Sequence, residues 1–284
     1  MDAATTASAA RRIALMPPPA LAGVVRYFHV ECDSGGPAIV PATPYPMLTL
    51  FAAGGSLVPS VDGRLALLCE PMLCGPVTAA LPAVWQQGTC FISALLEPAG
   101  FARLFGFSAA ELRDTPVALA DVDPALPSIA PAQDVLDTTD DPFRWADALQ
   151  RWLVSLLQRR ERAAAPFVLP AALLALPTGE IARHCGIGER QLERRFQHSY
   201  GQSLRAMRRM LRYTHALALL MRLPPRHGLL TRVAMDAGYH DQAHMVRDFI
   251  AYTGRPPGAW YAEPDDPLHR TYRYDAAQRW IVTR

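Results

Sequence analysis

One segment of the sequence places polar side chains at the spacing of an exposed helix face. Arg190, Glu193, Arg194 and Gln197 follow one another at intervals of one or three residues, with apolar residues on the opposite face. Arg can donate two hydrogen bonds to guanine, and Glu can accept one from the amino group of cytosine. Glu193 could instead pair with a neighbouring Arg. The face therefore has the chemistry to contact base edges.

A helix-turn-helix would position these side chains. Residues 178–185 are expected to form its first helix, residues 186–188 the turn and residues 189–198 the second helix. Ala182 is small where the two helices must approach each other. Gly186 can adopt the positive φ that the turn requires.

The same pattern occurs a second time further along the chain. Its residues match the first copy at an offset of 52 before the turn and 53 after it, which predicts a second turn one residue longer. The matching residues of the second copy are Val233, Ala234, Gly238, Tyr239, Met245, Arg247, Phe249 and Gly254. A single pattern of this kind is weak evidence, whereas a duplicated one is strong.

A long helix, Ser203–Arg222, is expected between the two copies. Such a helix could place two reading helices in successive turns of the major groove, about 34 Å apart. Arg205, Arg208, Arg209 and Arg212 share part of one face of this helix. Two interpretations stay open for that face, namely phosphate contact and a solvated basic surface.

Charge is distributed unevenly along the chain. The net charge is +2, but residues 1–141 hold 6 Arg against 14 acidic residues, whereas residues 178–262 hold 13 Arg against 6. This asymmetry predicts that the C-terminal part meets a polyanion. All basic residues are Arg, which we attribute to coding bias because the preference extends over the whole chain.

The two copies together resemble the DNA-binding domain of the AraC/XylS family of transcription regulators. The resemblance covers residues 178–262. It rests on residues 181–182, 186–187, 190–192, 194, 196 and 201 of the first copy, and on 233–234, 238–239, 241–244, 247, 249, 253–254 and 256 of the second. In that family the second helix of each copy reads the major groove. By this resemblance the DNA-binding residues are Arg190, Glu193 and Arg194 in the first copy and Gln242, Ala243, Val246 and Arg247 in the second.

Two of these positions depart from the family pattern. Ala243 replaces a usual Ser, and Met245 replaces a usual Phe. Because Ala243 and Val246 are apolar, the second copy is expected to read fewer bases, through thymine methyl groups or mainly phosphates. His244 is expected to pack or cap within this copy rather than to bind a metal.

The N-terminal half is expected to be rich in β-structure. Short apolar runs at Val24–Val30, Met47–Ala53, Leu65–Cys69 and Trp85–Leu96 are separated by Gly-containing turns. The predicted fold class is α+β, with a cupin-like β-sandwich or barrel and flanking helices followed by an all-α double helix-turn-helix domain. The cupin-like assignment comes from the family resemblance.

The predicted boundaries divide the chain into five parts. We expect a disordered N-terminus at 1–20, a β-rich regulatory domain with a connector at 21–141, and an amphipathic helix and linker at 142–177. The double helix-turn-helix follows at 178–262 and a tail at 263–284. The apolar stripe of the amphipathic helix could pack on its own domain or form a dimer contact.

Several functional classes are disfavoured by the sequence. No signal-peptide core or membrane-length apolar run occurs, so a cytoplasmic location without membrane contact is expected. The five cysteines form no CxxC pair and are interpreted mostly as small buried hydrophobes, with a redox- or metal-sensing pair as the minority view. No catalytic, metal or cofactor site is predicted.

The predicted function is sequence-specific transcription regulation. The resemblance implies double-stranded DNA as a partner, a small-molecule effector of unknown identity, a homodimer and contact with RNA polymerase. Whether the regulator is an activator or a repressor stays open. One alternative is an N-terminal domain that serves only protein contact or dimerisation. Another is an enzyme that transfers alkyl groups to Cys, for which the segment around Cys74 offers no activating base.

Overall fold

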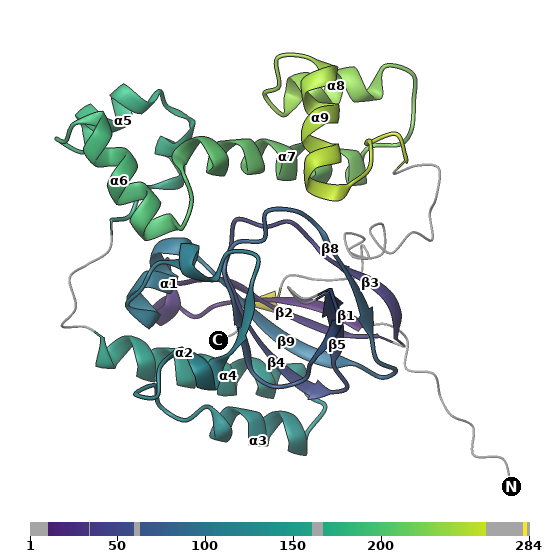
Figure 1. Ribbon diagram of the computed structural model, residues 1–284, viewed down its shortest axis with the longest axis vertical. Coiled ribbons are helices and arrows are strands. Elements are labelled where there is room, and N and C mark those ends of the chain that lie inside the picture. The colour runs from purple at the N-terminus through teal and green to yellow at the C-terminus, as the bar shows by residue number, and fades with distance from the viewer. Residues whose placement is uncertain (1–10, 34, 60–62, 161–166, 260–280, 283–284) are drawn as a thin grey trace, which may run out of the picture.

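The computed structural model describes residues 11–33, 35–59, 63–160, 167–259 and 281–282. Residues 11–160 form a β-rich domain, here called the β domain, and residues 167–259 form a helical domain that lies on top of it (Figure 1). The predicted α+β class, with a β-rich first half and a helical second half, is confirmed.

Two sheets make up the β domain. The larger has the strand order β10-β7-β4-β9-β2-β1-β11, and the smaller has the order β3-β8-β5-β6. Neighbouring strands are antiparallel except for the β1–β11 pair. Their bounds are β1 Arg11–Met16, β2 Val25–Cys32, β3 Gly36–Val40, β4 Met47–Ala53, β5 Ser56–Pro59, β6 Leu65–Leu68, β7 Met72–Cys74, β8 Leu81–Trp85, β9 Cys90–Leu96, β10 Pro116–Ala118 and β11 Ile281–Val282. Within the described part of the chain the sheets do not close into a barrel, so the barrel alternative is wrong.

Three sequence-based boundaries in this half need correction. Residues 11–16, expected to be disordered, form β1, because they pair along five residues of β2. The run Trp85–Leu96 is two strands rather than one, since a turn at 86–89 carries the chain from the smaller sheet to the larger. The connector expected at the end of the 21–141 region, Asp114–Asp141, contains β10 and two helices, α2 Leu119–Val122 and α3 Ala130–Thr138, where one helix was expected.

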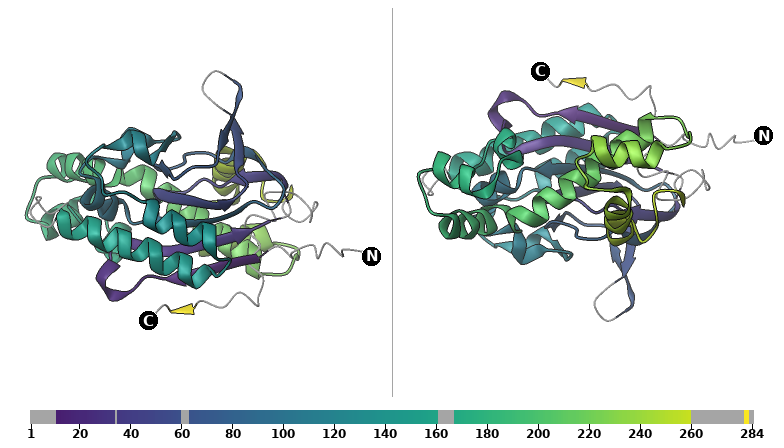
Figure 2. Two further views of the ribbon diagram at one scale, coloured as in Figure 1. Left: turned by 90° about the horizontal axis from the view of Figure 1, so that it is seen from below. Right: turned by 90° about the horizontal axis from the view of Figure 1, so that it is seen from above.

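Helices cover the face of the larger sheet that lies away from the helical domain. Figure 2 shows α3 and α4 (Pro142–Arg159) across this face, and both contact its strands. The apolar stripe of α4 is buried against this face. Its residues Trp145, Leu149 and Leu153 belong to the main core cluster and are at most 3% exposed. The stripe therefore packs on its own domain, and the dimer-contact alternative for it is wrong.

Two short elements of the β domain lie at its junction with the helical domain, α1 Pro98–Phe105 and η2 Ala109–Leu112. A third, η1 Pro19–Leu21, contacts α4 instead. Ser108 and Glu111 cap η2 reciprocally, which fixes its first turn. Both α1 and η2 contact the helical domain.

The helical domain follows the predicted arrangement. It contains η3 Ala171–Ala175, α5 Thr178–His184, α6 Glu189–Tyr200, α7 Leu204–Arg222, α8 Leu229–Asp236 and α9 Gln242–Thr253. The long connecting helix is α7, and the Ser203 side chain caps it by accepting a hydrogen bond from Ala206 N–H. Most of the tail, residues 260–280 and 283–284, lies outside the described residues.

Truncation of the α4 stripe tests the core assignment. Leu149→Ala should lower the free energy of unfolding by about 2–5 kcal/mol, because a fully buried Leu leaves a cavity. Phe143→Ala, on the same helix but 39% exposed, should cost much less. Denaturant titration of both variants provides the measurement. Equal losses of stability in the two variants would contradict the assignment. So would an unfolding midpoint that rises with protein concentration in the wild type but not in Leu149→Ala, because that would indicate a dimer contact.

Candidate nucleic-acid interface

The first helix-turn-helix unit consists of α5, a Gly-containing turn and α6. Its inner face is apolar and closed, because Ile181, Leu192 and Phe196 have no exposed surface. Gly186 in the turn has φ 64°, a conformation that only Gly adopts without strain. The packing thus fixes α6 by its inner face and leaves its outer face to solvent.

The predicted reading residues of the first unit lie on that outer face. Arg190, Arg194 and Gln197 are exposed, and Glu193 is half-buried. Burial lowers the pKa of Arg208 on α7, and the negative charge of Glu193 partly opposes this shift. Glu193 therefore has a basic neighbour on another helix in addition to its position beside the reading residues.

The second unit, α8 and α9, repeats this arrangement with the longer turn that the offsets predict. Asp241 caps α9, since its carboxylate accepts a hydrogen bond of 2.6 Å from His244 N–H. The His244 ring is half-buried and packs edge-on against Tyr239, with centroids 5.1 Å apart. These contacts agree with the expected packing role of His244.

The predicted reading residues of the second unit are less uniformly exposed. Ala243 and Arg247 are exposed, whereas Gln242 and Val246 are half-buried. The side-chain oxygen of Gln242, Oε1, accepts a hydrogen bond of 2.8 Å from the Thr231 hydroxyl on α8. Within the described residues, Arg247 Nε donates one hydrogen bond of 3.3 Å to Ala243 O, and the side chain also lines the cleft described below.

Both units are built on α7. Its first half inserts Leu204 and Met207 into the core of the first unit, and its second half inserts residues such as Tyr213 and Leu217 into the core of the second. Tyr213 is fully buried and contacts the rings of Phe249 and Tyr252 from α9. One continuous helix therefore sets the separation and relative rotation of α6 and α9.

An ion pair between a buried carboxylate and an exposed Arg, which the sequence reasoning did not find, also joins α9 to α7. The Asp248 carboxylate is 2% exposed and accepts a hydrogen bond of 2.7 Å from Arg209 Nε. Asp248 also helps to raise the pKa of Tyr239, although burial is the larger cause. The signal in the sequence was the acidic residue inside the second reading helix, between Arg247 and Phe249.

A cleft of about 730 Å³ lies between α6, α7 and α9, and the β domain forms part of its rim. Its lining is strongly basic, with a single acidic side chain, the Asp248 carboxylate that Arg209 neutralises. The basic residues of the lining are Arg113, Arg205, Arg209, Arg212, Arg247 and His244. Since Gln197 and Arg247 also line it, the cleft is continuous with the predicted reading surface.

The four arginines on α7 that the sequence grouped together have different roles. Arg208 turns away from the cleft and donates to the backbone carbonyl oxygens of Leu174 and Leu176, so it anchors η3. Arg205 and Arg212 line the cleft. Arg212 Nε is buried without a hydrogen-bond partner among the described residues, and its guanidinium lies 5.7 Å from the Tyr239 ring centroid.

The β domain contacts both units near the C-terminal ends of their reading helices. Arg113 donates to Gly201 O at 2.5 Å, and a Cβ on Gly201 would lie 2.6 Å from Ala110 N. At the second unit, Ala80 N–H donates to Tyr252 O at 2.7 Å, and Ala42 lies in the same buried cluster. A change within the β domain can therefore reach either reading helix.

The described part of the chain offers little support for a metal site, a membrane span or a reactive thiol at Cys74. It contains no group of three His, Cys, Asp or Glu side chains placed to hold a metal ion, and none of its helices is long and apolar enough to cross a membrane. Burial, with a contribution from Asp114, raises the pKa of Cys74 to about 12. This thiol is therefore protonated at neutral pH and is a poor nucleophile.

The geometry defines a domain of two helix-turn-helix units, and the comparison with protein families agrees with it. Residues 181–263 match the family described as helix-turn-helix domain. This part of the chain is a helix-turn-helix domain of the AraC type, which is a DNA-binding module of transcription regulators. No curated protein matches the chain.

Solved structures show distant similarity over most of the chain. A crystal structure of ToxT from Vibrio cholerae is 9% identical with a TM-score of 0.42, covering 82% of this chain and 96% of that one. A ToxT structure with bound unsaturated fatty acid is 10% identical with a TM-score of 0.41, covering 82% and 94%. The AraC-like transcriptional activator CuxR is 14% identical with a TM-score of 0.30, covering 69% and 78%.

Removing the partner of Asp248 tests the ion pair between the reading helix and α7. Arg209→Gln should lower the free energy of unfolding by about 1–3 kcal/mol, because it leaves a buried carboxylate without its charged donor. Arg205→Gln, an exposed position on the same helix, should change it by no more than about 0.5 kcal/mol. Urea denaturation measures both variants. If Arg209→Gln and Arg205→Gln were equally stable, the Asp248–Arg209 ion pair would have no structural role.

Proposed function

We propose that the protein binds specific sequences of duplex DNA and regulates transcription there, with α6 and α9 entering successive turns of the major groove. One observation carries the proposal: two helices with closed apolar inner faces present polar outer faces while sharing the rigid α7 between them. Because α7 holds the two reading helices at a fixed spacing, both can enter successive turns of the major groove of B-form DNA. The basic lining of the cleft between them suits its phosphates.

The first unit is proposed to supply most of the base discrimination. Arg190 and Arg194 are exposed donors on α6, and an Arg side chain can contact O6 and N7 of guanine together. Glu193 is suited to accept a hydrogen bond from cytosine, with Gln197 beside it on the same face. The neighbouring Arg208 balances the charge of Glu193 near phosphate.

The second unit is proposed to contact fewer bases than the first and to bind mainly the phosphate backbone. Ala243 is exposed and apolar, and Val246 is half-buried, so they can contact thymine methyl groups but cannot donate hydrogen bonds. Gln242 is engaged with Thr231 and would have to exchange that bond for one to a base. Arg247 is the charged member of this surface and is suited to a phosphate or a base edge.

We further propose that the β domain controls how the reading helices are presented, because it contacts the C-terminal ends of both. The small-molecule effector, the homodimer and the contact with RNA polymerase stay predictions from the family resemblance. The cytoplasmic location also stays a prediction. A role of the β domain in protein contact alone would use the same contacts to the reading helices.

Substitution of a first-unit reader tests base recognition. Arg190→Ala should weaken binding to the preferred duplex by about 1–3 kcal/mol, or roughly 5- to 150-fold in Kd, while changing non-specific binding little. The preferred duplex is obtained by selection from random sequences with the wild-type protein. Fluorescence anisotropy at fixed salt then compares the two proteins.

The matched control is Arg151→Ala on α4. Arg151 is exposed. Its helix, α4, lies on the far side of the β domain from the helical domain (Figure 1). This variant should bind both duplexes like the wild type. If Arg190→Ala retained full discrimination, or if selection enriched no sequence at all, base reading by α6 would be disproved.

Substitution in the cleft tests the phosphate contacts. The variant Arg205→Gln/Arg212→Gln should bind all duplexes more weakly by a similar factor. The slope of log K against log salt concentration should become shallower by about 2, one unit for each lost phosphate contact. An unchanged slope would assign these residues to the solvated basic face that is the other interpretation of the sequence.

A further inference from the structure

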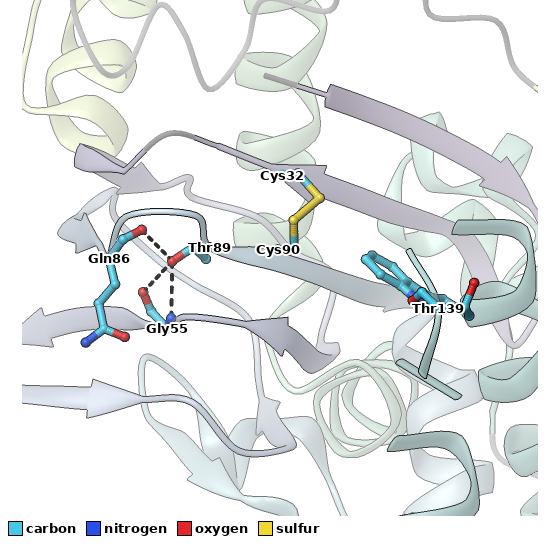
Figure 3. The surroundings of a disulfide bond; sticks show 7 residues. Cys32, Gly55, Gln86, Thr89, Cys90 and Thr139 are labelled. Carbon is cyan, nitrogen blue, oxygen red and sulfur yellow. Dashed lines mark hydrogen bonds between the residues drawn. A yellow bond between two sulfur atoms is a disulfide. The ribbon is translucent and has the colours of Figure 1, made fainter. Parts of the chain in front are cut away.

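Two of the five cysteines are joined in a disulfide at the end of the larger sheet. Cys32 is the last residue of β2 and Cys90 the first of β9, and they lie directly opposite each other with Cα atoms 4.1 Å apart (Figure 3). Cys69, Cys74 and Cys185 are free thiols. The sequence spacing did not distinguish the bonded pair, because 58 residues separate its members.

Both bonded cysteines are within reach of small reagents. Each is half-buried rather than enclosed, and each lies at a strand end beside the core instead of within it. In compartments kept reduced by thiol buffers, disulfides are usually transient or redox-sensing. A protein that acts on intracellular DNA would meet such conditions, so this part of the argument rests on the proposed function.

We propose that Cys32 and Cys90 form a redox-active pair that controls the second reading helix. Oxidation by hydrogen peroxide joins the two sulfurs, the two thiol protons leave, and the peroxide is reduced to two water molecules. A dithiol reverses the step by exchange: it becomes a cyclic disulfide, and both cysteines regain their protons. Neither direction needs any other reactant.

The segments that leave the disulfide are packed tightly against each other. Asp33 N–H donates to Thr89 O at 2.9 Å, directly beyond the disulfide. A Cβ on Gly35 would lie only 2.8 Å from the Gln87 Cα atom. The buried Thr89 hydroxyl accepts from Gly55 N–H and lies 2.8 Å from Gln86 O, as Figure 3 shows. Movement of the two strand ends is therefore passed to both segments.

These segments lead into β3 and β8, the paired strands at one edge of the smaller sheet, which are here called the ribbon. The ribbon runs towards the helical domain. Its register begins at Gly36 opposite Trp85, near the disulfide, and ends at Val40 opposite Leu81. Just beyond that end, Ala80 N–H donates to Tyr252 O in α9, and Ala42 lies in the core of the second unit. The ribbon thus connects the cysteine pair to the C-terminal end of a reading helix.

The consequence of oxidation follows from this connection. The disulfide closes the root of the ribbon and restricts how its two strands can shift. Reduction removes this covalent link and leaves the root held by hydrogen bonds and by the packing of Trp85 against Phe91. Because Ala80 and Ala42 form the contact with the second unit, the two redox states present α9 differently. The same loop beyond β3 also reaches the first unit, since Tyr45 packs against its core and Pro44 O lies 3.5 Å from Gln202 Nε2.

The test compares the full-length protein after peroxide and after a dithiol reductant. Alkylation with mass spectrometry should find a linked Cys32–Cys90 peptide in the first sample and both thiols alkylated in the second. Backbone amide exchange should be faster after reduction at residues 36–40, 80–85 and 252. Kd for the selected duplex should differ by at least about fivefold between the two states, a typical coupling between sites.

Matched variants separate this pair from the other cysteines. Cys69→Ser removes an exposed free thiol and should keep the full redox response. Cys32→Ser should bind DNA equally well with and without peroxide. A response lost in Cys69→Ser but kept in Cys32→Ser would overturn the assignment.

Two further results would also overturn it: failure of peroxide to link the pair, or reversible linkage with no change in amide exchange or Kd. If the protein bound no duplex in either state, amide exchange at the ribbon and at residue 252 would still decide the matter. A redox-dependent change there would support the pair, and only the DNA-binding proposal would fail.

Discussion

The interface depends on one constraint, namely that α7 belongs to two hydrophobic cores at once. Leu204 and Met207 are buried with α5 and α6, while Tyr213 and Leu217 are buried with α8 and α9. A helix cannot stretch or twist without breaking its backbone hydrogen bonds, so the two reading helices share a fixed spacing. The Asp248–Arg209 pair adds a directional contact to the apolar packing of the second unit.

The β domain adds a second constraint at the other ends of the same helices. It contacts the first unit through η2 and Arg113, and the second through the end of the β3–β8 ribbon. A signal in that domain can therefore reach both reading helices, while α7 keeps their spacing fixed. This gives a structural reason for joining a β domain to a DNA-binding domain in one chain.

Sequence reasoning succeeded where the determinants were local. The two turns, their difference of one residue and the capped α7 follow from Gly, apolar and Ser positions close together in the chain. It failed where the partner was distant: β1 is a strand because of β2, and the burial of α4 depends on the larger sheet. The short strands β3 and β8 contain Pro37 and Pro82 and show little alternation. The burial of Asp248 could not be predicted from its neighbours in the sequence, because its partner Arg209 lies on another helix, α7.

Hydroxyl-radical footprinting of the selected duplex tests the central claim most directly, because it reports the position of each reading helix along the DNA. Two rigidly spaced reading helices predict two protected segments on one face of the duplex, about 10 base pairs apart from centre to centre. A single protected segment, or two whose separation varies from site to site, would contradict the account.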